Sequence, residues 1–428
     1  MLMNTPIHDF LTAYGKSGIV RCHMPGGKGR NNPFDITEIY GADSLFECDG
    51  IISESEKNAS SLFGAGSTLF SCGGSTLSIQ AMLATLKDIT GKNTVIAGRY
   101  CHKSLINSCI LLGFDIKWAY PREYLGTDIK AEEIEKLIDS DTSAVFINSV
   151  DYYGGEADIK AVSEVCKKHN ILLLVDNAHG AYKVFTDDHP LKQGADMTAD
   201  SAHKTLPVLT GGAYMHLSNP DLRLVAKNAM NMFGSSSPSY LIMDSLDLCN
   251  RFIDEKKAEA LSLIHDVAVL KGWLSDIGYK LKKSDPMRIT IDTADYGYSG
   301  NEFTEILRNL GAECEMSDRQ YIVLLFSVSQ NRTDLMKLYK YLSLIEKKAP
   351  LTPEAHIILR PERVLSPREA YYGRKTAEKT ETATGRICAG VHTPCPPCVP
   401  LVMPGERIDE ECVNELIKYG VREILVSE

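Results

Sequence analysis

Short aliphatic runs alternate with amphipathic segments between about residues 60 and 217. The aliphatic runs predict strands over residues 94–97, 116–120, 144–149 and 171–175. Helices are expected between them: from Gly73-Gly74 to Gly91, over 104–112, around Ile134, Leu137 and Ile138, and around Ile159, Val162, Val165 and Cys166. This repetition predicts an α/β fold in which helices cover both faces of a mainly parallel sheet. Ligands of such sheets bind beyond the carboxyl ends of the strands.

Other segments flank this core on both sides. Residues 1–60 precede it as an N-terminal arm, and the large domain is expected to cover residues 61–245. A long helical stretch over about 245–271 leads into a smaller α+β region, 246–350, with strands expected at 287–291 and 321–326. The proline-rich stretch 351–367 links it to a C-terminal domain, 351–428.

Composition narrows the class of protein. A chain of 428 residues with 44% hydrophobic content can bury a large core. Its formal charge of -10 argues against a nucleic-acid partner. The N-terminus has no signal-peptide pattern and no aliphatic run is long enough to span a bilayer, so we expect a cytoplasmic protein without a membrane partner. The 12 scattered cysteines indicate reduced thiols.

The chemistry is predicted to centre on Asp176 and Lys204. Asp176 follows the strand predicted at 171–175, so its carboxylate should point into the ligand crevice. There it could keep a pyridine nitrogen protonated, while Lys204 supplies the amine for an imine with pyridoxal 5'-phosphate. Each residue alone is as well explained as a turn cap or a surface lysine. Together, at this strand position, they favour the cofactor.

A phosphate site is predicted where Gly73-Gly74-Ser75-Thr76 opens an amphipathic helix. Glycines let the backbone approach an anion, and a helix N-terminus offers free N–H groups. A hydroxyl there is often only an N-cap, but Ser201 and His203 beside Lys204 add matching donors.

Two histidine and cysteine motifs need separate interpretation. His102 starts the next helix and could stack on a flat ring whose other face meets small Ala178, although a histidine there can also have no task. Cys395-x-x-Cys398 has metal-like spacing, but no second pair completes a zinc site, so we expect no metal.

The motifs together resemble the ornithine/lysine/arginine decarboxylases, fold-type-I pyridoxal-phosphate enzymes, in a short form. The resemblance covers nearly the whole chain and includes His23-Met24-Pro25-Gly26 with Lys28, Asp35-Ile36-Thr37-Glu38, Cys101-His102-Lys103-Ser104, Tyr152-Tyr153-Gly154, Asp176-x-Ala178-His179-Gly180, Ser201-x-His203-Lys204 and Pro400-Leu401-Val402-Met403-Pro404-Gly405-Glu406.

The resemblance implies roles for these residues. Lys204 would bind the cofactor, Asp176 would pair with its pyridine nitrogen, and His102 would stack on its ring. The phosphate would be surrounded by Gly74, Ser75, Thr76, Ser201 and His203. The family also implies a homodimer with active sites at the subunit interface.

Five positions depart from the family pattern: Gly27, Asn177, Cys395, Cys398 and Gly390, where the family implies a glutamate. We expect these departures to leave the cofactor-binding residues intact and to affect which substrate is bound. The sequence thus predicts α-decarboxylation of arginine, lysine or ornithine, with Lys204 or His203 as proton donor. An aminotransferase or carbon–carbon lyase on this fold remains the alternative enzyme, and a catalytically silent homologue remains the alternative of another class.

Overall fold

A seven-stranded sheet forms the centre of the large domain. The computed structural model describes residues 3–124, 126–352, 357–394 and 399–428. The strand order is β1-β7-β6-β5-β4-β2-β3, and β7 pairs antiparallel with both β1 and β6, whereas the other pairs are parallel. The strands are β1 (Ser67–Ser71), β2 (Thr94–Gly98), β3 (Asp115–Ala119), β4 (Thr142–Asn148), β5 (Leu172–Asp176), β6 (Met197–Asp200) and β7 (Ala213–Leu217). The predicted mainly parallel sheet is confirmed.

Helices cover both faces of this sheet. Along β5, Leu174 packs into one hydrophobic cluster, whereas Leu173 and Val175 pack into another on the opposite face, as the alternation of side chains in a strand requires. The first face is covered by α3 (Gly74–Thr90), α4 (Lys103–Leu112) and α8 (Arg223–Phe233). The second is covered by α5 (Ala131–Glu135) and α6 (Ile159–Lys168), and further along by α2 (Ile51–Phe63) and α9 (Tyr240–Glu255).

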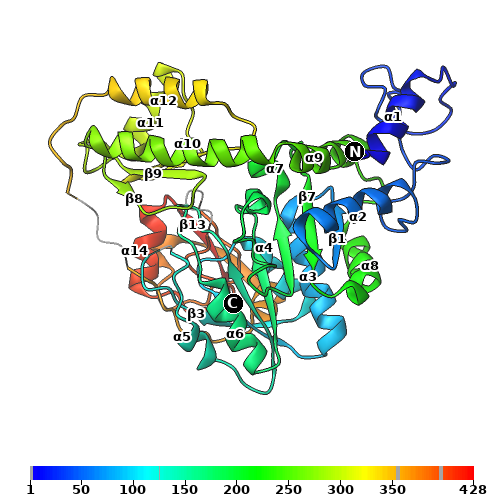
Figure 1. Cartoon of the computed structure of the whole chain (residues 1–428). Coiled ribbons are helices and arrows are strands. Elements are labelled where there is room, and N and C mark those ends of the chain that lie inside the picture. The colour runs from blue at the N-terminus through cyan, green and yellow to red at the C-terminus, as the bar shows by residue number, and fades with distance from the viewer. Residues whose placement is uncertain (1–2, 125, 353–356, 395–398) are drawn as a thin grey trace.

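Two predicted helices differ in extent from those found. The helix expected around Ile134 to Ile138 ends at Glu135, so its last two apolar residues lie beyond it. The long stretch expected over 245–271 is interrupted at Lys256, which separates α9 from α10 (Lys257–Asp276). The two helices lie end to end across the upper part of the molecule in Figure 1 and lead from the large domain to the small one.

The small region is built on a four-stranded antiparallel sheet. Its order is β10-β11-β9-β8, and α10, α11 and α12 pack on it. The elements are β8 (Leu281–Lys282), β9 (Arg288–Asp292), α11 (Gly300–Leu310), β10 (Met316–Ser317), β11 (Tyr321–Leu325) and α12 (Arg332–Ser343). Both strands expected here are found, each within a residue of its predicted start.

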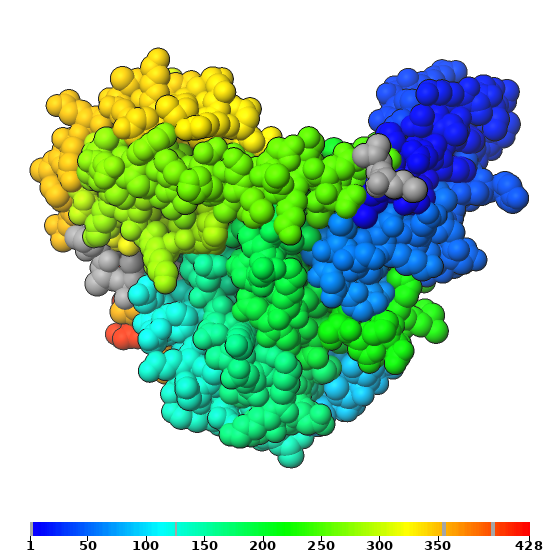
Figure 2. All heavy atoms as spheres, in the orientation of Figure 1, coloured from blue at the N-terminus to red at the C-terminus, as the bar shows by residue number. Residues whose placement is uncertain are grey.

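The chain ends contribute smaller elements. The C-terminal part holds α13 (Pro367–Tyr372), β12 (Lys375–Lys379), α14 (Glu410–Lys418) and β13 (Glu423–Ser427), with β12 and β13 paired. The N-terminal part holds α1 (Pro6–Lys16) and stands out as one of two lobes separated by a notch in Figure 2. The boundary predicted at residue 60 falls inside α2. The division into four regions stays a prediction.

Two expectations about the chain's environment can be compared with the described residues. The ten cysteines among them are all free thiols. No helix in the described part of the chain combines the length and apolarity needed to cross a bilayer.

Candidate active site

Lys204 lies at the edge of the sheet where the parallel strands end. It is on α7 (Ala202–Thr205), a short helix directly after β6. The half-buried amine lies 3.1 Å from His179 Nε2 and 6.0 Å from the centre of the Tyr152 ring. Burial lowers the pKa of Lys204 despite the opposing charge of Asp176. Lys204 is therefore not a solvated surface lysine.

Asp176 reaches the same edge from the neighbouring strand. It is the last residue of β5, and its pairing with Ala199 on β6 brings the two strand ends side by side. The carboxylate is 4% exposed, and one of its oxygens accepts a 3.0 Å hydrogen bond from the Ala178 amide. Burial raises the pKa of Asp176 more than the charge of Lys204 lowers it, so the carboxylate binds a proton more strongly than an exposed aspartate does.

The predicted phosphate donors are brought together around the start of α3. Gly74 is the first residue of α3 and has a φ of 65°, a left-handed conformation that glycine adopts without strain. A Cβ on Gly74 would point toward the His203 ring and lie 4.0 Å from its Cε1 atom. Ser201 Oγ donates a 3.0 Å hydrogen bond to Ser75 Oγ. Thr76 is exposed on the first turn of the helix.

The two predicted histidines are held by different contacts. His102 is the N-cap of α4, and its Nδ1 atom accepts hydrogen bonds from the Ser104 amide and hydroxyl. Burial, followed by the charges of Lys204 and Lys103, lowers the pKa of His102 to about 4, so its ring is neutral at pH 7. His203 Nδ1 lies 3.0 Å from the Gly212 carbonyl oxygen, to which it donates.

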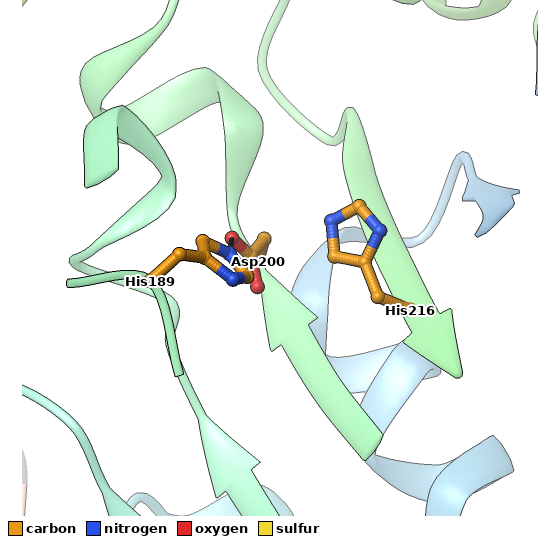
Figure 3. A group of neighbouring side chains, drawn as sticks. All are labelled: His189, Asp200 and His216. Carbon is orange, nitrogen blue, oxygen red and sulfur yellow. Dashed lines mark hydrogen bonds and ion pairs between the residues drawn. The ribbon is translucent and has the colours of Figure 1, made fainter. Parts of the chain in front are cut away.

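Behind Asp176 lies a buried polar network that the sequence did not predict. Asn177 is fully buried and donates from Nδ2 to Asp200 Oδ2 at 2.7 Å. The same oxygen is 2.9 Å from His189 Nε2, and Thr198 donates to the other Asp200 oxygen. His216 faces this pair across the strands (Figure 3). The departure at Asn177 thus packs behind the strand end, where it fixes the turn that carries Asp176.

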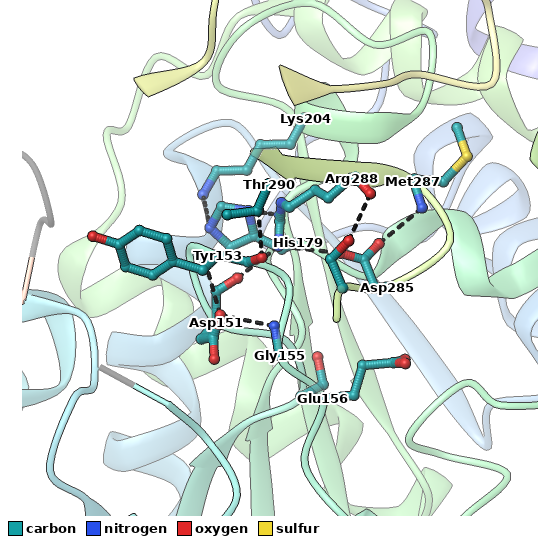
Figure 4. A network of polar contacts seen from close by, with 12 residues as sticks. Asp151, Tyr153, Gly155, Glu156, His179, Lys204, Asp285, Met287, Arg288 and Thr290 are labelled. Carbon is teal, nitrogen blue, oxygen red and sulfur yellow. Dashed lines mark hydrogen bonds and ion pairs between the residues drawn. The ribbon is translucent and has the colours of Figure 1, made fainter. Parts of the chain in front are cut away.

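Two charged residues of the small region also act on the site, and no sequence motif marked them. Arg288, the first residue of β9, contacts His179 through its guanidinium group (Figure 4). Glu315, just before β10, is among the charges that raise the pKa of Lys204 against the effect of burial. Neither residue could be assigned without knowing how the two domains pack.

Of the remaining departures, Gly27 and Gly390 lie in the described part of the chain and Cys395 and Cys398 do not. A Cβ on Gly27 would meet no atom of the described chain within 4 Å. Gly390 packs tightly against the C-terminal sheet, where an added Cβ would lie 2.6 Å from His392 Nε2. A glutamate cannot occupy position 390 without rearrangement. Cys395 and Cys398 fall outside the described residues, so the predicted rigid turn and the expected lack of metal there are not addressed.

Comparison with known proteins identifies the family that the sequence motifs resemble, in two segments of the chain. Residues 29–271 match the major domain of Orn/Lys/Arg decarboxylase, and residues 351–420 match the C-terminal domain of the same family. The chain is 28% identical to the uncharacterized protein YaaO of Bacillus subtilis, over 97% of this chain and 94% of that protein. It is 27% identical to an arginine decarboxylase of Bacillus anthracis, over 97% and 92%.

A solved structure supports the fold. The chain resembles lysine decarboxylase A from Pseudomonas aeruginosa with a TM-score of 0.78 over 97% of this chain and 75% of that one, at 17% identity. At this low identity the structural likeness shows the shared fold alone, and it confirms the predicted fold class. With a family model covering more than half of the sequence, the chain belongs to the Orn/Lys/Arg decarboxylase family of pyridoxal-phosphate-dependent amino-acid decarboxylases.

Proposed function

We propose that this protein binds pyridoxal 5'-phosphate through Lys204 and removes the α-carboxyl group of a basic amino acid. One observation carries the proposal: the Lys204 amine and the buried Asp176 carboxylate share one edge of the sheet, and burial lowers the pKa of the lysine. A lysine nucleophile must be unprotonated to attack a carbonyl carbon, and burial favours that form.

The residues at this edge fit the cofactor's charge and size. Its phosphate needs hydrogen-bond donors and room, which the N-terminus of α3, the Ser75 and Ser201 hydroxyls and the space beside Gly74 offer. Its pyridine nitrogen needs a carboxylate, and one Asp176 oxygen keeps its position by accepting from the Ala178 amide. The small side chain of Ala178 leaves space for a ring, and the neutral His102 ring could cover the opposite side.

The mechanism assigns a task to each of these groups. Bound pyridoxal phosphate supplies an electron sink for the electron pair left at the α-carbon when CO2 departs. Asp176 keeps the ring nitrogen protonated, because its raised pKa makes it a strong hydrogen-bond partner for that proton. When the substrate amine takes its place, Lys204 would accept a proton from that amine and could then deliver it to the α-carbon. We favour Lys204 over His203 for this step, since the Nδ1–H group of His203 already donates a hydrogen bond to the Gly212 carbonyl oxygen.

A basic amino acid is the proposed substrate class. The match to Orn/Lys/Arg decarboxylases and the arginine decarboxylase relatives support it. Glu315 offers a negative charge near Lys204 for the distal cation of such a substrate. Because Gly390 has no room for the acid that the family motif implies, Glu315 is the proposed replacement.

Release of labelled CO2 from arginine, lysine and ornithine tests the function directly. The purified protein is assayed with added cofactor, and the amine product and any pyridoxamine phosphate are quantified in the same reactions. We expect CO2 and amine in equal amounts from at least one of the three. Pyridoxamine formation without CO2 would indicate an aminotransferase, and no turnover of any of the three would contradict the proposal.

We also propose that the active protein is a homodimer. The arm exposes Ile19, Val20 and Met24, with 58%, 84% and 65% of their surface accessible. Apolar side chains in such a cluster favour contact with another protein surface. A two-fold interface would cover both arms and close both sites at once.

A further inference from the structure

Arg288 extends from the small domain into the active site of the large domain. Its side chain is 1% exposed. One guanidinium nitrogen donates to the Asp151 carbonyl oxygen at 2.6 Å and lies 3.5 Å from the Asp285 carboxylate. The other terminal nitrogen hydrogen-bonds His179 Nδ1, as Figure 4 shows. Arg288 is thus held on both sides of the domain boundary.

The contact with Arg288 determines where His179 carries its proton. A guanidinium group has only donors and stays protonated at any physiological pH. His179 Nδ1 must therefore accept with its lone pair, which leaves the single proton of a neutral imidazole on Nε2. Burial, together with the charges of Lys204 and Arg288, lowers the pKa of His179 far below its ordinary value, so the neutral ring is the stable form.

The proton on His179 in turn determines the state of Lys204. Nε2 lies 3.1 Å from Lys204 Nζ and has a hydrogen to donate. An ammonium group has three donors and no lone pair, so only the neutral amine can accept this hydrogen bond. The chain of contacts from Arg288 through His179 therefore selects the unprotonated lysine.

We propose that Arg288 is a positioning residue that fixes the tautomer of His179 and thereby holds Lys204 as a neutral, nucleophilic amine. The consequence for cofactor binding rests on the proposed function, in which Lys204 attacks the cofactor aldehyde. Since Arg288 belongs to β9, the packing of the small domain against the large one sets the reactivity of a lysine on the other domain.

Other charged and titratable groups face Lys204 and must be weighed in any titration. They are Asp176 on β5, His102 before α4, Tyr152 after β4, Arg288 on β9 and Glu315 before β10. The two carboxylates raise the pKa of Lys204, whereas burial and Arg288 lower it. A test must therefore separate the long-range charge of Arg288 from its contact with His179.

Competitive acetylation of the full-length chain, freed of cofactor, measures this separation. Acetic anhydride labels neutral amines only, and mass spectrometry of the Lys204 peptide, referenced to exposed Lys257, gives the neutral fraction at each pH. The variants are Arg288→Met, Arg288→Lys, His179→Phe and the double variant Arg288→Met with His179→Phe. Arg332→Met, a change at an exposed arginine of the same domain, is the control.

We expect Arg288→Met to move the pH midpoint of Lys204 labelling upward by about one unit, which is a tenfold change in the equilibrium between amine and ammonium. Without Arg288, His179 can move its proton to Nδ1 and accept from an ammonium. Arg288→Lys should restore labelling, because an ammonium is also a pure donor. In the His179→Phe background, Arg288→Met should change labelling less than about twofold. Unchanged labelling in Arg288→Met, or an equal effect in both backgrounds, would overturn the proposal.

A second measurement covers the case in which Arg288→Met does not fold. Nitrogen-15 NMR of wild-type protein with labelled histidine rings, assigned by His179→Phe, reports which ring nitrogen carries the proton. We expect a bare Nδ1 and a protonated Nε2, and a proton on Nδ1 would refute the inference. Borohydride reduction of the cofactor-loaded protein and peptide mapping test Lys204 as the attachment site, so failure of the proposed function is seen separately.

Discussion

Replacing Asp176 with asparagine isolates the chemical task of its carboxylate from its structural one. In the folded chain one Asp176 oxygen accepts from the Ala178 amide at 3.0 Å, and an asparagine oxygen can accept the same hydrogen bond. The turn should therefore survive, and the free energy of unfolding should change by no more than about 1 kcal/mol. The other oxygen is replaced by an NH2 group, which donates where the cofactor's ring nitrogen needs an acceptor.

The expected loss in rate follows from this exchange of acceptor for donor. Asp176 is 4% exposed, so little water can screen or replace its charge. A missing electrostatic partner in such a site costs on the order of 10² in kcat, or about 2.7 kcal/mol. The assay is CO2 release at saturating substrate, with cofactor occupancy measured by absorbance.

Asp196→Asn is the matched control for Asp176→Asn. Asp196 also accepts a hydrogen bond from a backbone amide, that of Leu173, but at the start of β5, away from Lys204. It should keep full activity. An Asp176→Asn enzyme within a few-fold of wild type would refute the assignment of Asp176.

Other predictions test the anchor, the substrate charge, the C-terminal domain and the arm. Lys204→Ala should lose the visible absorbance of bound cofactor and all activity; a retained wild-type spectrum would count against Lys204. Glu315→Gln should raise KM for a basic substrate more than it lowers kcat, and steady-state kinetics giving the reverse would exclude a role in binding. Glu406→Gln should lower the free energy of unfolding by about 3–5 kcal/mol in urea titrations, because it leaves buried Arg99 without its ion-pair partner; an unchanged midpoint would contradict this. Removal of residues 1–30 should weaken dimerisation and turnover together, as sedimentation beside activity assays can show, and a fully active monomer would refute the dimer proposal.

The sheet could be predicted because its strands and helices are marked locally. β2, β4 and β5 are mostly aliphatic runs, and glycines such as Gly91 and Gly113 end helices in the left-handed conformation. No strand was predicted at the positions of β1, β6 and β7, and β6 (Met197–Asp200) is not an aliphatic run. The break at Lys256 was missed because the apolar spacing continues across it, and no proline or glycine marks the interruption. Boundaries that depend on how a helix packs onto its neighbours leave little trace in a local pattern.

Only the site residues at the carboxyl-end edge of the large sheet could be predicted from the sequence. Asp176 ends β5 and Lys204 comes just after β6, its parallel neighbour, so their proximity follows from the sheet order. The protonation state of Lys204 depends instead on which atom lies opposite its amine. His179 is 25 residues away in the sequence, and Arg288 is 109 residues from His179, in another domain. The Arg288 guanidinium has only donors, and its position in the folded chain determines the tautomer of His179 and so the protonation state of Lys204. Neither residue type nor sequence spacing shows that position. If domain packing sets the charge of Lys204, a change at Asp285, which holds Arg288 from within the small domain and accepts a hydrogen bond from Tyr182 of the large domain, should shift the titration of Lys204.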